Sequence, residues 1–266
     1  MSVVTTEYFK LQKEIIEKQD QWKHEIVNHI NAVPNALKND NQPLISQIQL
    51  NVDLEKYRQY IFELIDLLAV IKSEFKNELY MVKDIINPDI LQQWVDEVLA
   101  YNDFYFNNFA EKNGLSQWLP YFLAEQAVRP YLRAISTVYQ GELYETDPIE
   151  TCPCCGEPIR LARLEGKVGK KVVHCPRCFA NWSEKRSKCS HCGKDHSEAL
   201  HYLHIEDNKK LQIHICEDCN GYVKVIDTRG TFKQENPAIL DLNTIHLDIL
   251  AQEKGYGVSK VKTTIN

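Results

Sequence analysis

The spacing of apolar residues divides the chain near residue 146. Before this point, hydrophobic side chains recur at steps of three and four positions, which is typical of amphipathic helices. The pattern predicts a long polar helix over 5–31, an amphipathic segment over 53–82 and a further helix over about 116–140. The apolar face of the second segment comprises Leu54, Tyr57, Ile61, Leu64, Ile65, Leu68, Ile71, Phe75 and Leu79. Long helices with short connections favour an antiparallel, bundle-like packing.

Local signals predict where these helices begin and stop. Asn87 precedes Pro88, and an asparagine cap followed by proline in the first turn is a typical helix start. Gly114 interrupts the helical pattern. Pro130 lies inside the predicted helix over 116–140. Because proline lacks an N–H group and clashes with the preceding turn, it predicts a kink or a break there.

Residues 146–235 show a different pattern. Glycines, cysteine pairs and short β-branched runs replace the helical periodicity. Runs at 171–174, 211–215 and 221–226 predict short strands in small hairpins tied together by metal. Asn236-Pro237 then repeats the cap-plus-proline start. It predicts a final helix that runs to about Gly255 and packs back on the body.

Together these patterns predict a multi-domain fold that combines α-helices with small β modules. An N-terminal α-helical domain over 1–145 is followed by two tandem rubredoxin-like or zinc-ribbon modules, over 146–184 and 185–235. A C-terminal helix and tail occupy 236–266. A chain of 266 residues has the length of one or two ordinary domains, so the metal modules are expected to be small.

All nine cysteines fall within residues 152–219, and eight of them form four C-x-x-C pairs. The pairs are Cys152/Cys155, Cys175/Cys178, Cys189/Cys192 and Cys216/Cys219. Two such pairs supply four thiolates, which is the ligand set of one tetrahedral Zn²⁺ or rubredoxin-type iron site. Four pairs therefore predict two metal ions, zinc or iron, each held by four cysteines. A single C-x-x-C also occurs in redox motifs, so the repetition carries the prediction.

The gaps between the pairs indicate which pairs share an ion. They are 19, 10 and 23 residues long. Sequential pairing gives two local ribbons with similar gaps, which favours it over an interleaved cross-brace. The favoured arrangement joins Cys152, Cys155, Cys175 and Cys178 in site 1, and Cys189, Cys192, Cys216 and Cys219 in site 2.

One cysteine, Cys154, does not belong to the four C-x-x-C pairs. Cys154 lies inside the first knuckle, between the two ligands of the first pair. A spare thiol that points away from the metal is the favoured interpretation, and a redox-active thiol is the alternative. His174 and His191 border or lie inside knuckles, and we expect them to lie beside the metal sites or in solvent rather than to bind the ions.

Other polar residues give weaker signals. His201, His204 and His214 are expected to be ordinary surface or packing residues. Asp241 and Asp248 lie seven positions apart, which predicts a shared, solvated face of the last helix rather than a catalytic pair. The sequence has no phosphate loop, nucleophile elbow or zinc-hydrolase signature. Two saturated four-cysteine sites also leave no open coordination position, so we expect no enzyme.

Composition and charge exclude several classes of protein. The chain is 44% hydrophobic and 26% charged, as expected of soluble globular proteins, and no stretch approaches a membrane span. The first residues lack a basic segment followed by an apolar one, so we expect no secretory signal and a cytoplasmic location. Clustered cysteines bind metal there more often than they form disulfides, which disfavours a secreted disulfide scaffold.

The charge distribution is uneven. Residues 1–145 carry 13 Lys and Arg against 21 Asp and Glu, whereas residues 152–192 carry nine basic residues against three acidic ones. The local basic excess offsets part of the negative charge of the thiolates. With a net charge of −6 over the whole chain, nucleic-acid binding is the weakest of the functional alternatives.

The order of these segments resembles the formate dehydrogenase accessory protein family, FdhE. The resemblance is specific over about 152–255 and looser upstream, at Gln42-Pro-Leu-Ile45 and Gln126-Ala-Val-Arg-Pro130. Its motifs are Cys152-Pro-Cys-Cys-Gly156, Cys175-Pro-Arg-Cys178, Cys189-Ser-His-Cys192-Gly193, Cys216-Glu-Asp-Cys219, Tyr222-Val-Lys224 and Asp241-Leu-Asn-Thr-Ile-His-Leu-Asp248. The family's knuckles match pair by pair, so the resemblance implies the same eight ligands. It gives Cys154 no role.

The resemblance implies a cytoplasmic, non-catalytic assembly factor. Such proteins are needed to make active formate dehydrogenase, and the implied partner is that enzyme's catalytic subunit. The implied fold is a helical domain followed by two rubredoxin-like modules. The alternatives are a redox or thiol-active protein, suggested by the rubredoxin-like sites and Cys154, and a zinc-ribbon protein that binds nucleic acid. The oligomeric state is left open by the sequence.

Overall fold

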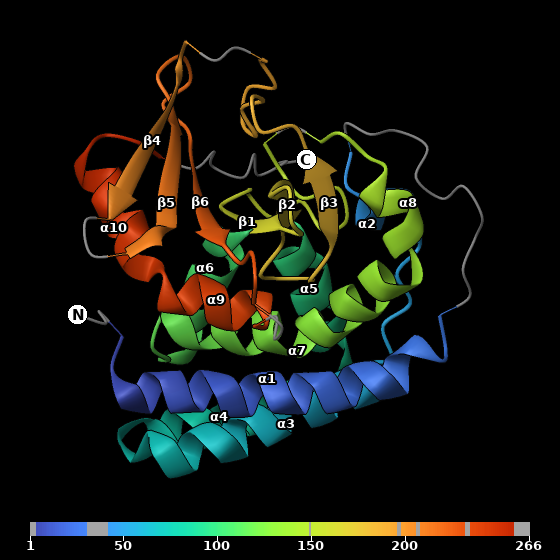
Figure 1. Ribbon diagram of the computed structural model, residues 1–266. Helices are drawn as coiled ribbons and strands as arrows, with labels where there is room; N and C mark the ends of the chain where they lie inside the picture. Colours follow the sequence, from blue (N-terminus) through green and yellow to red (C-terminus); the bar gives the residue numbers. More distant parts are fainter. Residues whose placement is uncertain are drawn as a thin grey trace. The chain divides into compact units, whose positions relative to one another are not determined.

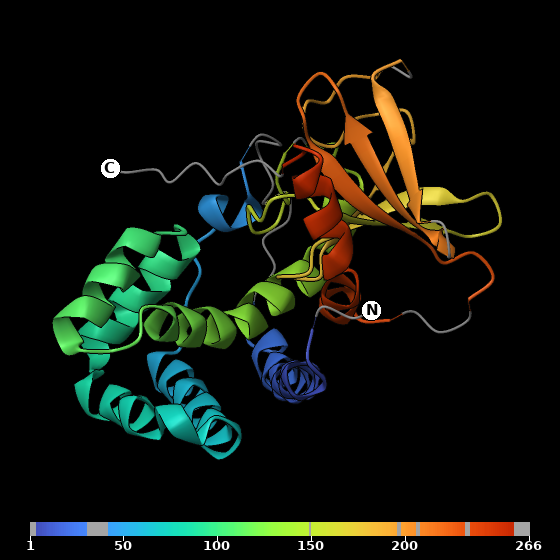
Figure 2. The same ribbon diagram turned by 90° about the vertical axis from the view of Figure 1, so that its left-hand side faces the viewer.

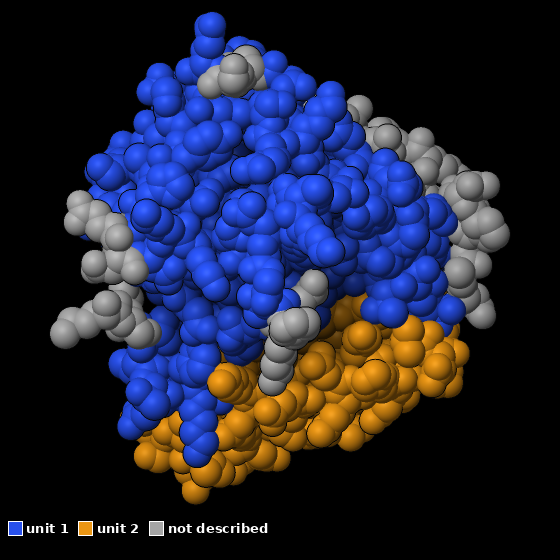
Figure 3. Space-filling view, in the orientation of Figure 1, with its two compact units in different colours: residues 1–10, 30–49, 135–261 blue, residues 11–29, 50–134, 262–266 orange. Residues whose placement is uncertain are grey.

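The structure is a computed structural model, shown in Figure 1. The chain divides into two compact units, which Figure 3 distinguishes by colour. The helical unit comprises residues 11–29, 50–134 and 262–266, and the cysteine-rich unit comprises residues 1–10, 30–49 and 135–261. The residues that the structure describes are 4–30, 42–148, 150–195, 198–205, 208–231 and 235–257.

The first half of the chain is helical, as its periodicity predicts. Its helices are α1 (Thr6–Val27), α2 (Leu44–Gln47), α3 (Leu54–Ile71), the short 3₁₀ helix η1 (Ser73–Phe75), α4 (Lys76–Ile85), α5 (Pro88–Leu99), α6 (Asp103–Asn113), α7 (Trp118–Val138) and α8 (Gln140–Tyr144). The apolar face expected over 53–82 is buried along α3, where Tyr57, Ile61 and Leu64 are fully shielded from solvent. The segment is not one helix, however, because Lys72 leaves the helical conformation and η1 connects α3 to α4.

The predicted capping residues occupy the ends of their helices. The Asn87 side chain accepts a 3.1 Å hydrogen bond from the Ile90 N–H, and Pro88 occupies the first turn of α5. Gly114 ends α6 in the left-handed conformation, with φ of 65°. A side chain at this position would be strained, so glycine is the residue that such a helix end favours.

The predicted break at Pro130 does not occur, because α7 continues through it to Val138. Proline removes the N–H that would bond the carbonyl of the residue four positions earlier, Gln126. The fully buried Gln19 of α1 replaces this donor, since its Nε2 lies 2.8 Å from the Gln126 carbonyl oxygen and 2.9 Å from Gln126 Oε1. The orphaned carbonyl is therefore satisfied inside the helical unit, and the helix tolerates its proline.

The cysteine-rich unit is built on one six-stranded sheet. The strands are β1 (Leu161–Glu165), β2 (Lys170–His174), β3 (Asn181–Glu184), β4 (Leu200–Ile205), β5 (Asn208–Cys216) and β6 (Tyr222–Asp227). Their order across the sheet is β3-β2-β1-β6-β5-β4, visible from two sides in Figures 1 and 2. All neighbours are antiparallel except β1 and β6, which run parallel.

The two expected metal modules are thus joined rather than separate. Strands β1 and β2 lie between the first and second cysteine pairs, and β3 follows the second pair. Strands β4 and β5 lead into the last pair, and β6 follows it. The parallel pairing of β1 with β6, which sets Leu161 against Lys224, makes one sheet of both. The four-part division at 145, 184 and 235 stays a prediction, since a shared sheet does not show where independent folding units end.

The expected C-terminal helix consists of two helices. α9 (Pro237–Asn243) begins after the Asn236 cap, and α10 (Ile245–Glu253) follows Thr244. Leu247 and Ala251 of α10 pack with buried residues of β5 and β6, so the helix covers part of the sheet. Residues 258–266 of the predicted tail lie outside the described residues. None of the helices within the described residues is both long and apolar enough to cross a membrane.

Candidate metal centres

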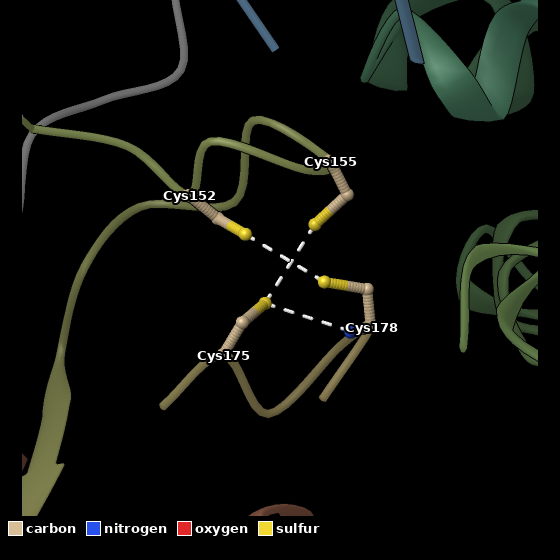
Figure 4. A group of neighbouring side chains, drawn as sticks. All are labelled: Cys152, Cys155, Cys175 and Cys178. Carbon is tan, nitrogen blue, oxygen red and sulfur yellow. Dashed lines mark hydrogen bonds between the residues drawn. The ribbon is translucent and has the colours of Figure 1, made fainter. Parts of the chain in front are cut away.

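Site 1 is a closed cluster of four buried cysteines. The knuckle before β1 supplies Cys152 and Cys155, and the turn between β2 and β3 supplies Cys175 and Cys178. Figure 4 shows the four sulfur atoms converging on one point, with 3.6 Å between the sulfurs of Cys152 and Cys178 and 3.6 Å between those of Cys155 and Cys175.

Site 2 repeats this arrangement in a more exposed position. The knuckle after β3 supplies Cys189 and Cys192, and the turn between β5 and β6 supplies Cys216 and Cys219. The sulfurs of Cys189 and Cys219 are 3.7 Å apart, and those of Cys192 and Cys216 are 3.9 Å apart. Cys189 and Cys216 are buried, whereas Cys192 is half-buried and Cys219 is exposed.

The sulfur geometry fits a tetrahedral metal ion in both sites. With metal–sulfur bonds of about 2.3 Å, the edges of an ideal S₄ tetrahedron are about 3.8 Å long. The four sulfur–sulfur separations of 3.6–3.9 Å lie close to this value, and within each group all four ligand atoms lie within 4.8 Å of one another. A tetrahedral thiolate set suits zinc or iron. Each group contains two successive pairs, so the cysteines are not brought together as an interleaved cross-brace.

The electrostatics of site 1 also call for a cation. Burial raises the pKa of the Cys152 and Cys178 thiols well above their usual value. Burial also raises the pKa of Cys175, but hydrogen bonds from Cys152, Cys155 and Cys178 more than offset this and hold it well below the usual value. A divalent cation offsets two of the four negative charges that the thiolates would carry, so metal binding favours ionisation of these buried cysteines.

The four knuckles share one backbone design. The N–H of each first cysteine donates to the carbonyl five residues later, at 2.7–3.0 Å; the pairs are Cys152 with Glu157, Cys175 with Ala180, Cys189 with Lys194, and Cys216 with Gly221. The residue after each second cysteine is left-handed, and these residues are Gly156, Phe179, Gly193 and Asn220. Phe179 and Asn220 thus adopt this conformation without being glycine. Gly221 has another role, because a Cβ there would lie 2.7 Å from the His191 ring.

Cys154 lies beneath a cover that the sequence did not predict. Its side chain is fully buried, and its carbonyl accepts a 3.1 Å hydrogen bond from the Ile45 N–H. The neighbouring Pro153 carbonyl accepts a 2.8 Å bond from the Leu44 N–H, so the start of α2 closes over the first knuckle. The family-like segment at residues 42–45 contains these two donors. A redox role for Cys154 stays a prediction, and any reagent must first displace this cover.

A buried polar triad connects the two sites. Lys171 of β2 lies 2.5 Å from Glu184 Oε2 and 3.1 Å from Ser190 Oγ, and Ser190 donates a 2.6 Å hydrogen bond to Glu184. Ser190 belongs to the third knuckle, between two ligands of site 2. Its carbonyl also accepts a 2.8 Å bond from the Glu150 N–H, just before the first knuckle of site 1. One backbone hydrogen bond therefore links the third knuckle to the segment just before the first knuckle.

The histidines lie outside both sulfur groups. The His174 ring nitrogen lies 2.9 Å from a Glu165 carboxylate oxygen, and His191 Nε2 lies 2.9 Å from the Tyr222 carbonyl oxygen. Both rings therefore hydrogen-bond residues near the knuckles. His214 is buried against Tyr202, and burial together with the charge of Lys171 lowers its pKa to about 3. The remaining two histidines of the sheet, His201 and His204, are exposed.

The expectation of a solvated acidic face at Asp241 and Asp248 is wrong. The two residues lie on different helices, and both turn toward the fully buried Lys224 of β6, each with an oxygen 2.7 Å from its Nζ. Arg160 also pairs with Asp241 at 3.0 Å. Burial would raise the pKa of Asp241, but the charges of Arg160 and Lys224 lower it. The segment motifs at 222–224 and 241–248 thus form one ion cluster that attaches α9 and α10 to the sheet.

Comparisons with known proteins agree with this picture. Residues 187–264 match a family model described as FdhE, C-terminal domain. A protein named FdhE homolog from Aquifex aeolicus is 28% identical over 148 residues, which cover 54% of this chain and 52% of that protein. One from Shewanella sp. is 31% identical over 118 residues, or 41% of this chain and 36% of that protein. The matches thus span about half or less of these curated relatives.

The fold is similar to a solved structure over most of its length. The crystal structure of the FdhE protein from Pseudomonas aeruginosa matches with a TM-score of 0.58 and 20% identity, covering 92% of this chain and 85% of that chain. At this identity the match speaks for the fold. The chain is thus similar to FdhE proteins by sequence over part of its length, and by fold over most of it.

Proposed function

We propose that this protein is a non-catalytic, metal-binding accessory protein of formate dehydrogenase. It binds that enzyme's catalytic subunit in the cytoplasm and serves its maturation. The observation that carries the proposal is the pair of closed four-cysteine clusters in a chain of FdhE type. Four sulfurs saturate a tetrahedral ion, so the clusters support structure and docking rather than metal-assisted hydrolysis.

The eight cysteines would hold the two ions. Cys152, Cys155, Cys175 and Cys178 are the proposed ligands of site 1, and Cys189, Cys192, Cys216 and Cys219 are those of site 2. A bound zinc ion supplies structural cross-linking, and iron supplies an additional one-electron couple. The protein's own residues position the sulfurs through the knuckle backbone and exclude water from site 1.

Co-purification tests the proposal. The tagged, metal-loaded protein is expected to retain the catalytic subunit of formate dehydrogenase from cells that make both. A variant with Cys189→Ser and Cys216→Ser, which removes site 2, is expected to retain less. A matched control is Cys154→Ser, which keeps all eight proposed ligands and is expected to retain the subunit as the parent protein does. Absence of the subunit from the parent eluate would refute the proposal.

A redox role is the second candidate, and one observation favours it. Site 2 brings Cys219 to the surface, so an iron ion there would lie within reach of an electron-transfer partner. Voltammetry of the iron-loaded protein tests this candidate. A reversible couple that disappears in Cys219→Ser supports the redox role. If the zinc-loaded protein retains the catalytic subunit as well as the iron-loaded protein does, the redox role is contradicted.

A further inference from the structure

The two edges of the sheet are treated differently. At β3 the side chain of Gln140 imitates a neighbouring strand. Its Nε2 donates to the Asn181 carbonyl at 2.7 Å, and its Oε1 accepts from the Asn181 N–H at 3.3 Å. At the opposite edge, β4 pairs with β5 on one side, and no described residue pairs with its other side. Figures 1 and 2 show β4 as the outermost strand of the sheet.

The register shows which backbone groups of β4 face outward. The Glu217 N–H donates to the Ala199 carbonyl at 2.9 Å, so this opposed pair is hydrogen-bonded. In an antiparallel ladder such pairs alternate with pairs that are not hydrogen-bonded. The N–H and C=O groups of Leu200, Tyr202 and His204 therefore point away from β5. Up to the register shift that follows His204, they form an array of donors and acceptors that complements another extended backbone.

Strand β4 has only one of the usual guards of a sheet edge, a register shift between His204 and Ile205 at its last residues. Proteins protect exposed edges with lysine, proline or an inward-pointing charge. The sequence from Leu200 to Ile205 contains no proline and no Lys, Arg, Asp or Glu. Tyr202 is 47% exposed, and it gives the edge an aromatic surface on which a partner strand can pack.

The charges at the two ends of β4 have opposite sign. Exposed Glu198 and Glu217 lie beside its first residues, whereas exposed Lys209 and Lys210 of β5 lie near its last residue. A strand that pairs antiparallel with β4 starts beside the lysines and ends beside the glutamates. Complementary charge therefore calls for an acidic residue at the start of that strand and a basic residue at its end.

We propose that the outer edge of β4 binds an extended peptide segment of a client protein as an added antiparallel strand. The segment has an uncharged, β-prone middle, an acidic residue at its N-terminal end and a basic residue at its C-terminal end. The identity of the client rests on the proposed accessory function. A second copy of the chain is the less suitable occupant. Two paired six-residue strands would bury far less surface area than the about 1,200 Å² that a stable dimer interface buries.

The site lies close to the second metal cluster. Leu200 of β4 stands opposite Cys216 of β5, so a bound antiparallel segment would end one strand away from site 2. Backbone pairing gives affinity for many sequences, and the end charges give orientation. This combination suits a protein that recognises a client before the client's own fold is complete.

Fluorescence anisotropy with a defined peptide tests the proposal. The probe is labelled acetyl-Glu-Thr-Val-Thr-Val-Thr-Lys-amide, added to the full-length, metal-loaded protein. Tyr202→Pro removes one outward N–H and no native hydrogen bond, so it is expected to weaken binding by about tenfold or more. Tyr202→Thr is the matched control, because it removes the aromatic ring but keeps the backbone donor, and it is expected to bind within about threefold of the parent.

Further measurements guard against misfolding and misassignment. His204→Lys keeps the backbone donor and places a charge on the edge, and it is expected to weaken binding as well. Metal content is expected to be unchanged in all three variants, and loss of the contact between the Tyr202 and His214 rings is expected to lower the midpoint of thermal unfolding in both Tyr202 variants. A peptide with the two charged residues exchanged is expected to bind more weakly, and equal binding would refute the proposed orientation.

The opposing outcomes are equally definite. Parent-like binding by Tyr202→Pro overturns the edge as the site, and an equal loss in Tyr202→Thr assigns binding to the ring. If the parent protein dimerises, binds no peptide, and loses dimerisation in Tyr202→Pro, a second copy is the occupant and the proposal is refuted.

If Tyr202→Pro loses the peptide but still retains the formate dehydrogenase subunit, the edge is not the client site. If the parent binds the peptide but retains no subunit, the edge stands and the accessory function fails.

Discussion

The two cysteine clusters use the same knuckle backbone in different surroundings. In site 1 all four cysteines are buried, and the start of α2 closes over the knuckle beside Cys154. In site 2 Cys219 is exposed and Cys192 is half-buried. The same ligand set is therefore placed once as part of a core and once at a surface, beside the outer edge of β4. We infer that site 1 mainly stabilises the fold and that site 2 is the more exchangeable one.

The largest expected difference comes from removing one ligand at each site. Cys175→Ser opens a fully buried cluster, whereas Cys219→Ser removes an exposed ligand. Because a structural metal contributes its binding energy to folding, we expect Cys175→Ser to lower the free energy of unfolding by several kcal/mol, on the order of 5, and Cys219→Ser by about half as much. Chemical denaturation of each metal-loaded variant measures this. Equal losses would remove the distinction between the sites.

The next effect concerns the triad between the sites. Lys171→Met leaves Glu184 buried without its cation, and breaking such a pair is expected to cost about 3 kcal/mol. The double variant Lys171→Met with Glu184→Leu removes both charges and is expected to regain most of this loss. Denaturation together with metal analysis checks both variants. If metal loss in Lys171→Met occurs at one site alone, the triad does not couple the two knuckles.

A smaller, pH-dependent effect is expected at the ion cluster under α9 and α10. Asp241→Asn removes one of two carboxylates from Lys224, which should cost about 2 kcal/mol at pH 7. The lowered pKa of Asp241 gives stability that is present above the unfolded-state pKa of about 3.9 and is lost as pH falls through the folded-state value. The difference between parent and variant should therefore shrink below about pH 4. A difference that grows with acidity would contradict the assigned sign.

The smallest effect compares the two knuckles that lack glycine at the left-handed position. Asn220 is exposed, so Asn220→Gly should relieve backbone strain and stabilise the protein by about 0.5 kcal/mol. Phe179→Gly relieves similar strain but loses a side chain that is half-buried at site 1, so it should destabilise. Thermal unfolding of the two variants measures the signs. The same sign in both would show that the surroundings of the knuckles are alike.

Much of this arrangement follows from local sequence patterns. Cysteine spacing predicts the grouping, because a knuckle is a short local structure. The caps at Asn87 and Asn236 are local as well, since the bonded N–H groups lie within three residues.

The features that escaped prediction depend on residues distant in sequence. The helix continues through Pro130 because Gln19 supplies a donor to the Gln126 carbonyl, 107 positions away in the sequence. Lys224 forms ion pairs with Asp241 and Asp248 of two later helices. The cover over Cys154 comes from Leu44 and Ile45. Hydrophobic periodicity and motif spacing depend on residues that are close in sequence, so these patterns do not indicate any of the long-range partners.

The central claim is that each chain holds two ions and that site 2 exchanges first. Native mass spectrometry of anaerobically purified protein during a chelator titration tests it directly. We predict two zinc or iron ions per chain at the start and a one-ion species during the titration. Cys219→Ser should remove the faster step and Cys175→Ser the slower one. A chain that carries one ion or none, or that loses the ion of site 1 first, would contradict the account.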